Sequence, residues 1–166
     1  MASCLFIVDV QRGFVRQHSR QIPEKLGSLQ HEYDLVIASR FVNAPNSAHR
    51  RLIGWSKMGA EESEAIEFAF PVRSDAYIVE KTAYVPVFPE VLRLLARHGV
   101  DTVDIAGIDT DVCVTQTAVA VFETEWLRPR VLADYCASSG GPEFHDAALK
   151  ILRRLIGEAQ VVSHGC

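Results

Sequence analysis

Three residues that can act as base, cation and nucleophile lie at the ends of apolar runs. Asp9 closes the first run, Lys81 closes the third, and Cys113 follows the fourth after a short turn. In open α/β sheets, ligands bind beyond the carboxyl ends of the strands. If these runs are parallel strands, a carboxylate, an ammonium group and a thiol meet above one edge of a sheet. Such a set can perform nucleophilic catalysis on a carbonyl group.

Cys113 lies at the junction between a strand pattern and a helical pattern. The stretch "DIAGIDTDVCVTQTAVAVFE" (104–123) changes from a strand pattern to a helical pattern at the cysteine. If Asp111 caps the helix, Val112 and Cys113 occupy its first turn, where backbone N–H groups lack intrahelical partners. The helix dipole also favours negative charge there. We therefore expect a lowered thiol pKa, a nucleophilic sulfur and N–H groups that can hold an oxyanion.

Each of the three residues also has an ordinary structural interpretation. A lone cysteine in an apolar α/β protein is usually a small core residue. An aspartate at a strand end is more often a turn residue, and a lysine there more often reaches solvent. Their coincidence at one edge of the sheet favours catalysis, but the residues alone leave both interpretations open.

The elements that must position these residues are strands and helices in alternation. The longer apolar runs lack polar alternation, which is typical of parallel strands buried on both faces. The alternation predicts βαβ units with right-handed crossovers in one layered α/β domain, residues 1–166. The expected strands lie at residues 3–10, 34–41, 76–81, 102–108, 130–135 and 160–164.

The helical patterns differ in clarity. The one at 89–99 starts with proline and ends with glycine, as helices often do. The one at 112–126 is apolar on most sides, which indicates a buried helix. The segment 42–75 is the least readable, with a turn at "NAPNS" and a short helix expected around 49–56. The expected helices are 23–33, 89–99, 112–126 and 141–159.

Composition narrows the class of protein. The chain has 166 residues, 48% of them hydrophobic, a mean hydropathy of +0.08 and a net charge of −4. This suits a single domain, since domains most often have roughly 100–150 residues. A pI near 5.8 without a basic cluster argues against nucleic acid as a partner. No apolar run approaches the ~20 residues of a membrane span.

Compartment is predicted from the chain start and the cysteines. The opening "MASCLFIVDV" is too short and too soon interrupted by Asp9 for a signal peptide. Cys4, Cys113, Cys136 and Cys166 are scattered, without a C-x-x-C pair. A disulfide framework or a zinc site is not expected, and a reducing cytoplasm fits best. We assign no chemistry to the cysteines other than Cys113.

Three local motifs resemble one family. "FIVDVQRGF" (6–14) resembles the D-x-Q-x-x-F opening of the isochorismatase-like cysteine hydrolases. "VEKTAYVPVF" (79–88) is similar to the strand that supplies their lysine, and "GIDTDVCVTQTA" (107–118) to their nucleophile turn. The motifs occur in family order. The resemblance implies a three-layer αβα sandwich, Rossmann-like, with a mainly parallel six-stranded sheet.

The resemblance also implies the site. It assigns a catalytic triad of Asp9, Lys81 and Cys113 that hydrolyses a C–N bond through a thioester. It implies a cis peptide bond at Ile108–Asp109, which would direct the N–H of Asp109, together with that of Cys113, at the oxyanion. The side chain of Asp109 departs from the small residue that is frequent in the family's amidases, and its carboxylate would restrict substrates. No cofactor is expected.

The sequence departs from the nicotinamidases of the family, which carry a D-x-H metal motif after the second strand. Here that region reads "ASRFVNAPNSAHRRLIGW" (38–55), with His49 but no D-x-H. We expect no metal, and we expect His49 to be a surface residue. Isochorismatases proper lack the cysteine, so Cys113 favours amide chemistry.

Pocket residues are less clearly indicated. Phe14 and Tyr84 are candidates to stack on a planar substrate, with core packing as the alternative. Gln11 either hydrogen-bonds near Asp9 to bind substrate or stabilises its loop. Arg40 and Asn43, at the end of the second strand, either bind a substrate carboxylate or face solvent or another subunit.

Other functions stay open at this point. The leading hypothesis is a metal-independent hydrolase of a small amide, carbamoyl or ureido compound. The alternatives are a catalytically silent binding or scaffold protein, a nicotinamidase with an atypical ring-binding site, and a redox role for Cys113. The resemblance implies a homo-oligomer, dimer or tetramer, with Trp55 or Trp126 in an interface.

Overall fold

The computed structural model describes residues 2–163, which contain one sheet of six parallel strands. The strand order is β3-β2-β1-β4-β5-β6. The strands are β1 (Cys4–Val8), β2 (Leu35–Phe41), β3 (Tyr77–Lys81), β4 (Thr102–Ile108), β5 (Arg128–Ala137) and β6 (Val161–Val162). Each overlaps an expected run, although residue 164 of the sixth run and Cys166 lie outside the described residues. The six-stranded parallel sheet is confirmed.

The inner strands are apolar because other elements cover both of their faces. Every residue of β1 is buried, and in β4 only Thr102 is partly exposed. Burying one Val, Leu or Ile side chain contributes roughly 1.5–3 kcal/mol. At the edge, β3 exposes Tyr77, Ile78 and Glu80. The centre of the sheet is therefore buried on both faces.

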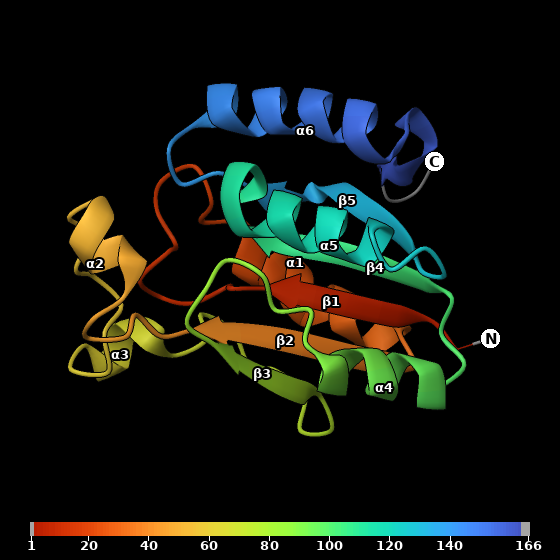
Figure 1. Ribbon diagram of the computed structural model, residues 1–166, viewed down its shortest axis with the longest axis horizontal. Helices are drawn as coiled ribbons and strands as arrows, with labels where there is room; N and C mark the ends of the chain where they lie inside the picture. Colours follow the sequence, from red (N-terminus) through yellow and green to blue (C-terminus); the bar gives the residue numbers. More distant parts are fainter. Residues whose placement is uncertain (1, 164–166) are drawn as a thin grey trace.

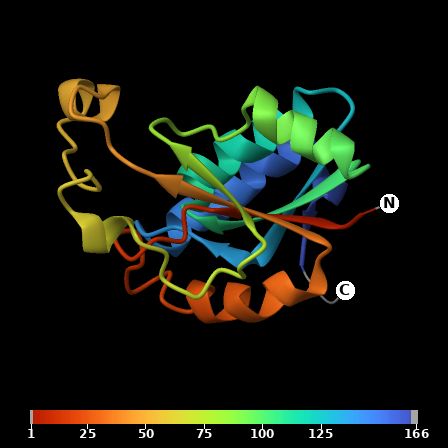
Figure 2. The ribbon, with the colours of Figure 1, turned by 90° about the horizontal axis from the view of Figure 1, so that it is seen from below.

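Helices cover the sheet on both sides, as the three-layer prediction requires. One face carries α1 (Ile22–Leu29), and the other carries α4 (Pro89–Arg97), α5 (Thr115–Phe122) and α6 (Pro142–Ile156) (Figures 1 and 2). Short 3-10 turns, η1 (Gln30–Glu32) and η3 (Glu158–Gln160), follow α1 and α6. Among residues 2–163, no helix combines the length and apolar character that crossing a membrane requires.

The strand order reverses between β1 and β4. From β1 the chain proceeds to β2 and β3 on one side, then crosses back to β4 and continues on the other side. Such a reversal opens a crevice beyond the carboxyl ends of the two strands. Asp9 directly follows β1, and the turn with Cys113 follows β4. The topology thus brings these two residues to one place.

Gly107 permits the close approach of β4 to β1. It has φ 136°, and a Cβ at this position would lie 2.2 Å from the carbonyl oxygen of Val8. The obstructing atom is backbone, so it cannot swing aside. Only glycine fits where β4 approaches the crevice.

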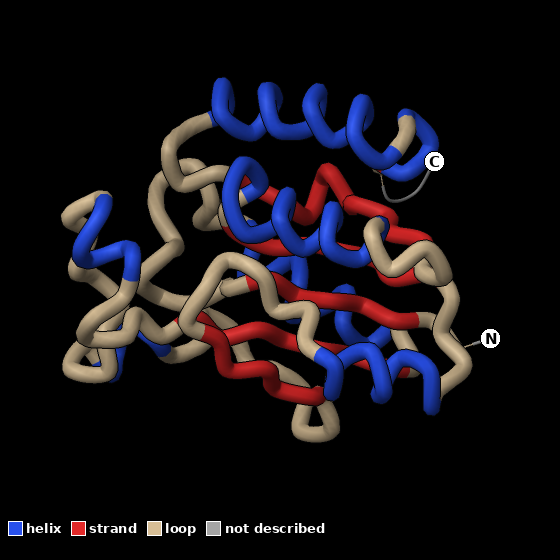
Figure 3. The backbone as a smooth tube through the Cα atoms, viewed as in Figure 1, coloured by secondary structure: helices blue, strands red, loops and turns tan. Residues whose placement is uncertain are grey.

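The segment 42–75 consists mostly of loops, and its first part lies beyond the carboxyl ends of the strands (Figures 1 and 3). Its last residues return to the amino end of the sheet, where Arg73 donates to the carbonyl oxygens of Tyr33 and Asp34. It contains two short helices, α2 (Ala48–Leu52) and α3 (Ser63–Ile66). The helix expected around 49–56 is α2, which is shorter. Side chains from this segment form one wall of the crevice.

Candidate active site

A fully buried ion pair lies beside the Cys113 thiol. Oδ2 of Asp9 and Nζ of Lys81 lie 2.7 Å apart, and neither side chain is exposed. Lys81 also donates to the carbonyl oxygens of Ala83 at 3.1 Å and Tyr84 at 2.8 Å. The Ser39 hydroxyl donates to Oδ1 of Asp9 at 2.7 Å. These hydrogen bonds supply the additional partners that a buried ion pair requires.

The carboxyl group of Asp9 is adjusted by opposing effects. Burial raises its pKa, whereas Lys81, Ser39 and Cys113 lower it by charge and hydrogen bonding, and the net direction is upward. The backbone of Asp9 has φ 50°, a left-handed conformation that aspartate tolerates better than most residues. Asp9 is therefore a stronger base than an exposed aspartate.

Cys113 lies in a turn of π-helix, Thr110–Val114, that joins β4 to α5. The N–H of Val114 donates to the carbonyl of Asp109 at 3.1 Å, which is the π-helical spacing. The prediction that Asp111 caps the helix is wrong: Asp109 holds the cap position, and Asp111 is exposed within the turn. Sequence periodicity does not reveal a π-turn, because the extra residue belongs to a single turn.

The Cys113 thiol is close enough to Asp9 and Lys81 to interact with both. It is buried, with 7% of its surface exposed. Burial raises the pKa of Cys113 well above its ordinary value, Asp9 raises it further, and Lys81 lowers it. The expectation of a lowered pKa is thus wrong in direction, since the cost of desolvating a thiolate exceeds the stabilisation from a helix terminus, at most about 2 kcal/mol.

The nucleophile turn is anchored from two further elements. The carboxylate of Asp109 accepts hydrogen bonds from the N–H and the hydroxyl of Ser139, at 2.7 and 2.8 Å. Oγ1 of Thr110 lies 2.8 Å from Nδ1 of His145 on α6. The peptide bond Ile108–Asp109 is cis, at the position that the resemblance implies. The sequence did not indicate Ser139 or His145, because neither lies in a recognisable motif.

A cavity of about 410 Å³ opens above the thiol. Phe14, Phe41, Trp55 and Tyr84 line it, and so does Cys113. The rings of Phe14 and Trp55 are stacked, with centroids 6.1 Å apart and an interplanar angle of 19°. Phe14 and Tyr84 therefore lie where a substrate-binding residue would have to be.

His49 is not the surface residue that the sequence indicated. Its exposed fraction is 8%, and it lines the cavity. Its ring makes edge contacts with Phe41, Trp55 and Tyr84, at centroid distances of 5.1, 5.9 and 4.8 Å. The predicted surface position of His49 was wrong because the three rings that bury it come from separate segments, and no local sequence pattern indicates that they are in contact.

Gln11 is fully buried and serves the backbone. Its Nε2 donates to the carbonyl oxygens of Phe41 at 2.9 Å and Ile66 at 2.8 Å, and its Oε1 accepts from the N–H of Phe41 at 2.8 Å. These bonds fix the loop after β1 to the end of β2. Gln11 thus stabilises the loop, the second of its two expected roles, and does not line the cavity.

Arg40 and Asn43 also have structural partners. Arg40 forms an ion pair with Glu80 at 2.6 Å. Asn43 is buried, and its Nδ2 donates to the carbonyl oxygens of Trp55 at 3.0 Å and Lys57 at 2.9 Å. Neither side chain lines the cavity. Asn43 instead holds the segment that carries Trp55.

The cavity residues do not fit a metal site. A zinc site requires three or four Cys, His, Asp or Glu ligands. The cavity offers His49, Asp109 and Cys113, but Ser139 already binds the carboxylate of Asp109. Within residues 2–163, no three such side chains are grouped so that they could hold a metal ion.

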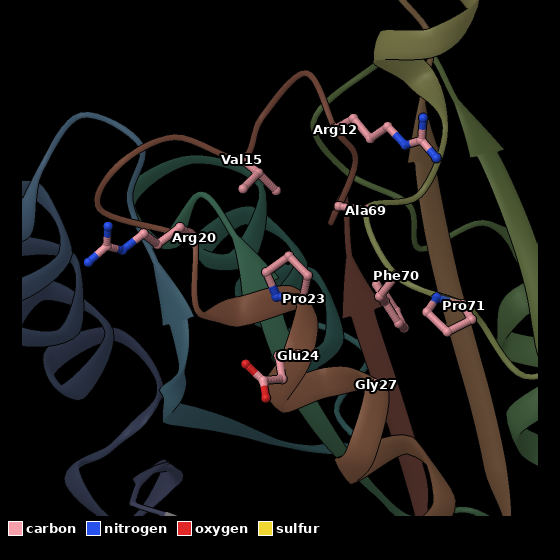
Figure 4. A pocket seen from close by; sticks show the side chains of 9 residues that line it. All are labelled: Arg12, Val15, Arg20, Pro23, Glu24, Gly27, Ala69, Phe70 and Pro71. Atoms are coloured by element: carbon pink, nitrogen blue, oxygen red, sulfur yellow. The ribbon is translucent and has the colours of Figure 1, made fainter.

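A larger hollow, of about 670 Å³, lies beside α1. Figure 4 shows that its two arginines, Arg12 and Arg20, point away from each other, with Glu24 on the helix between them. No thiol or imidazole lines it. Without converging polar groups, this hollow has no evident chemistry.

Solved structures share the fold over nearly their whole length. The pyrazinamidase of Pyrococcus horikoshii in complex with zinc is 22% identical, with a TM-score of 0.84 over 98% of this chain and 99% of that one. The nicotinamidase of Bacillus subtilis is 22% identical, with a TM-score of 0.81 over 98% and 100%. The N-carbamoylsarcosine amidase of Thermoplasma acidophilum is 22% identical, with a TM-score of 0.74 over 92% and 93%.

The sequence itself establishes the family. No curated protein matches the chain. The sequence model of the isochorismatase domain, however, matches residues 3–164, almost the entire chain. This match agrees with the parallel sheet and with the motifs around Asp9, Lys81 and Cys113. The chain belongs to the isochorismatase domain family.

Proposed function

We propose that this protein is a hydrolase that cleaves a C–N bond of a small amide, carbamoyl or ureido compound through a thioester at Cys113, without a metal. The observation that supports this most is the fully buried ion pair of Asp9 and Lys81, 2.7 Å apart, beside the thiol that lines the cavity. Membership of the isochorismatase family and fold neighbours described as amidases agree with the proposal.

The proposed reaction starts from a protonated thiol. The raised pKa keeps Cys113 in the thiol form until substrate is bound. Asp9 then takes the thiol proton as the sulfur attacks the carbonyl carbon, and the Lys81 ammonium stabilises the negative charge shared by carboxylate and sulfur. The attack gives a tetrahedral oxyanion, for which we propose the backbone N–H groups of Asp109 and Cys113 as donors.

Collapse of the intermediate breaks the C–N bond. Asp9 returns its proton to the departing amine, which leaves an acyl thioester on Cys113. Water then attacks the thioester while Asp9 accepts one of its protons. Breaking the C–S bond releases the acid, and the proton on Asp9 returns to the sulfur. Every proton that Asp9 accepts is thus given back within one cycle.

The test is a screen of small amides, carbamoyl and ureido compounds for ammonia release. We expect wild-type protein to hydrolyse at least one compound and Cys113→Ala to hydrolyse none. Cys136→Ala is the matched control, because Cys136 is a buried thiol that does not line the cavity. Its variant should keep the activity.

Two results would contradict the proposed hydrolase, and each has a different meaning. Ammonia release by Cys113→Ala, purified from a host without its own amidases, would refute the nucleophile. Absence of turnover in the whole screen, with tight binding of one compound, would instead support the scaffold alternative. The homo-oligomer and the cytoplasmic location are also proposals, for which light scattering and cell fractionation are the tests.

A further inference from the structure

Asp109 stands directly before the nucleophile turn, and its side chain reaches across to the neighbouring strand end. Its carboxylate accepts hydrogen bonds from the N–H of Ser139 at 2.7 Å and from the Ser139 hydroxyl at 2.8 Å. Ser139 follows the carboxyl end of β5, so the two residues link the ends of β4 and β5. Both are partly exposed, and both line the same cavity as Cys113. A carboxylate is thus built into the lining of the cavity within one turn of the thiol.

The charge of this carboxylate has no neutralising partner. Within residues 2–163, no Lys, Arg or His side chain forms an ion pair with Asp109. Burial raises the pKa of Asp109, the hydrogen bonds from Ser139 lower it, and the nearby carboxylates of Asp111 and Asp9 raise it. Lys81 is already paired with Asp9. The inner part of the site therefore holds one more negative charge than positive charges.

The cations of the cavity do not offset this excess. Arg16 and Lys57 line the cavity, but both side chains are exposed. Water and salt screen exposed charges strongly, whereas a partly buried charge is screened less. The imidazole of His49 adds no cation, because burial and the Lys81 ammonium lower its pKa. A charged group that approaches Cys113 through this cavity is therefore influenced more by Asp109 than by the two exposed cations.

The link between the strand ends does not by itself require a charge. Asparagine has an acceptor oxygen for the N–H of Ser139 and an NH₂ group that could donate to its hydroxyl. A partly buried carboxylate pays a desolvation cost that an amide of the same shape avoids. The negative charge thus needs a reason other than the link, and a cationic or N–H-bearing ligand in the cavity supplies one.

We propose that Asp109 selects substrates by charge, disfavouring an acyl group that carries a carboxylate and favouring one that carries an ammonium group or several N–H donors. This inference rests on the proposed function, because it places the acyl group in the cavity beside Cys113. Each carboxylate oxygen keeps a free lone pair after binding Ser139, so it can accept a hydrogen bond from such a group. Among small amide, carbamoyl and ureido compounds, cationic and uncharged N–H-rich ones are the expected substrates, and carboxylic acids are excluded.

The first experiment uses the thiol as the probe of charge and needs no turnover. Iodoacetamide and iodoacetate have nearly the same size, but only iodoacetate is anionic. Alkylation of Cys113 by each reagent is followed near neutral pH by mass spectrometry of the peptide that contains it. The ratio of the two rate constants cancels the thiolate fraction, which is common to both reactions. In wild type, the ratio of the iodoacetamide rate to the iodoacetate rate should exceed that of glutathione, and Asp109→Asn should lower it by about three- to tenfold.

Further variants separate the charge from the hydrogen bonds. Ser139→Ala removes the hydroxyl that binds Asp109 but leaves the carboxylate, so it should keep the wild-type ratio. Asp111→Asn makes the same chemical change at an exposed residue of the nucleophile turn and should alter the ratio by less than about twofold. Asp109→Ala, with the small side chain that is frequent here in the family's amidases, replaces Asp109→Asn if that variant does not fold.

The second experiment extends the ammonia-release screen to sets of compounds matched in length. One such set is 3-aminopropanamide, butanamide and succinamate, which carry a cationic, an uncharged and an anionic end. In a set that the wild type hydrolyses, kcat/KM should be at least about tenfold higher for the cationic member than for the anionic one. Asp109→Asn should narrow that difference by about three- to tenfold.

Four results would overturn the inference. They are a wild-type ratio in Asp109→Asn, a ratio in Ser139→Ala that falls as far as in Asp109→Asn, a wild-type ratio below that of glutathione, and faster hydrolysis of the anionic members. The third would mean that Arg16 and Lys57 dominate the cavity. Failure of the proposed function is separate: it appears as no turnover of any compound or as ammonia release by Cys113→Ala, and the alkylation ratio still decides whether Asp109 selects by charge.

Discussion

Replacing Lys81 by methionine leaves the Asp9 carboxyl group buried without its cation. In the native protein, Nζ of Lys81 lies 2.7 Å from Oδ2 of Asp9, and both side chains are fully buried. Methionine fills most of the space of the lysine stem but carries no charge and donates no hydrogen bond. The perturbation is therefore almost purely electrostatic.

The expected cost follows from that burial. Removing one member of a buried ion pair costs about 3–5 kcal/mol, because the other charge stays desolvated. The two hydrogen bonds from Lys81 to the carbonyls of Ala83 and Tyr84 are also lost, at about 1 kcal/mol each. For a domain with a total stability of about 5–15 kcal/mol, this is a large fraction.

The cost must depend on pH, and its sign is fixed. Burial already raises the pKa of Asp9, and Lys81 opposes that shift, so the variant has a still higher folded pKa. Between the unfolded pKa of about 4 and the folded pKa, the folded state holds the proton and the unfolded state does not. Stability then falls by about 1.4 kcal/mol per pH unit as the pH rises. The defect of Lys81→Met should therefore shrink in mild acid.

Urea unfolding near neutral pH and in mild acid tests this reasoning on wild type, Lys81→Met, Asp9→Asn and the double variant. The double variant should be more stable than Lys81→Met near neutral pH, because no charge is left buried. Lys150→Met, on the exposed side of α6, should change stability by less than about 0.5 kcal/mol. A cost below about 1 kcal/mol for Lys81→Met, independent of pH, is the behaviour of an exposed pair and would refute the argument.

Three further predictions concern Ser39, Gly107 and Cys113. Ser39→Ala removes a hydrogen bond that lowers the pKa of Asp9, so the acid limb of the pH–rate profile should move to higher pH; an unmoved limb would contradict the role of Asp9 as base. Gly107→Ala should destabilise the protein by at least about 1–3 kcal/mol in urea unfolding, since its Cβ meets the Val8 carbonyl oxygen at 2.2 Å; a native-like midpoint would argue against that approach. Alkylation of Cys113 by iodoacetamide should keep accelerating from about pH 7 to about pH 10, because burial raises the thiol pKa; a plateau below about pH 8 would indicate a lowered one.

The sheet was predictable because its burial is uniform. Strands covered on both faces leave continuous apolar runs in the sequence, and β1 and β4 keep that pattern almost without exception. Helix α4 was equally clear, since Pro89 starts it and Gly99, with φ 65°, follows it. These signals are local, and each one has a single physical cause.

The position of Cys113 near a helix start was predictable from the sequence, but the direction of its pKa shift was not. A helix start after a strand is visible in the sequence, and the dipole argument follows from it. Burial of the thiol next to Asp9 is not visible, because it depends on the packing of residues that are distant along the chain. Desolvation decides the direction of the pKa shift, so a correct position was joined to a wrong electrostatic expectation.

The same distinction explains why the sequence predicted the pair of Asp9 and Lys81 but not the aromatic side of the cavity. Strand ends converge by topology, so Asp9 and Lys81 could be placed together although β2 lies between their strands. The aromatic side of the cavity follows no such rule. His49 and Trp55 belong to an irregular segment, which the hydrogen bond from Asn43 to the Trp55 carbonyl helps to hold. Regular elements thus position the groups that we propose to react, whereas loops supply much of the lining of the cavity. Under the proposed function, substitutions in the 42–75 segment should accordingly change which compound binds long before they change how its bond is broken.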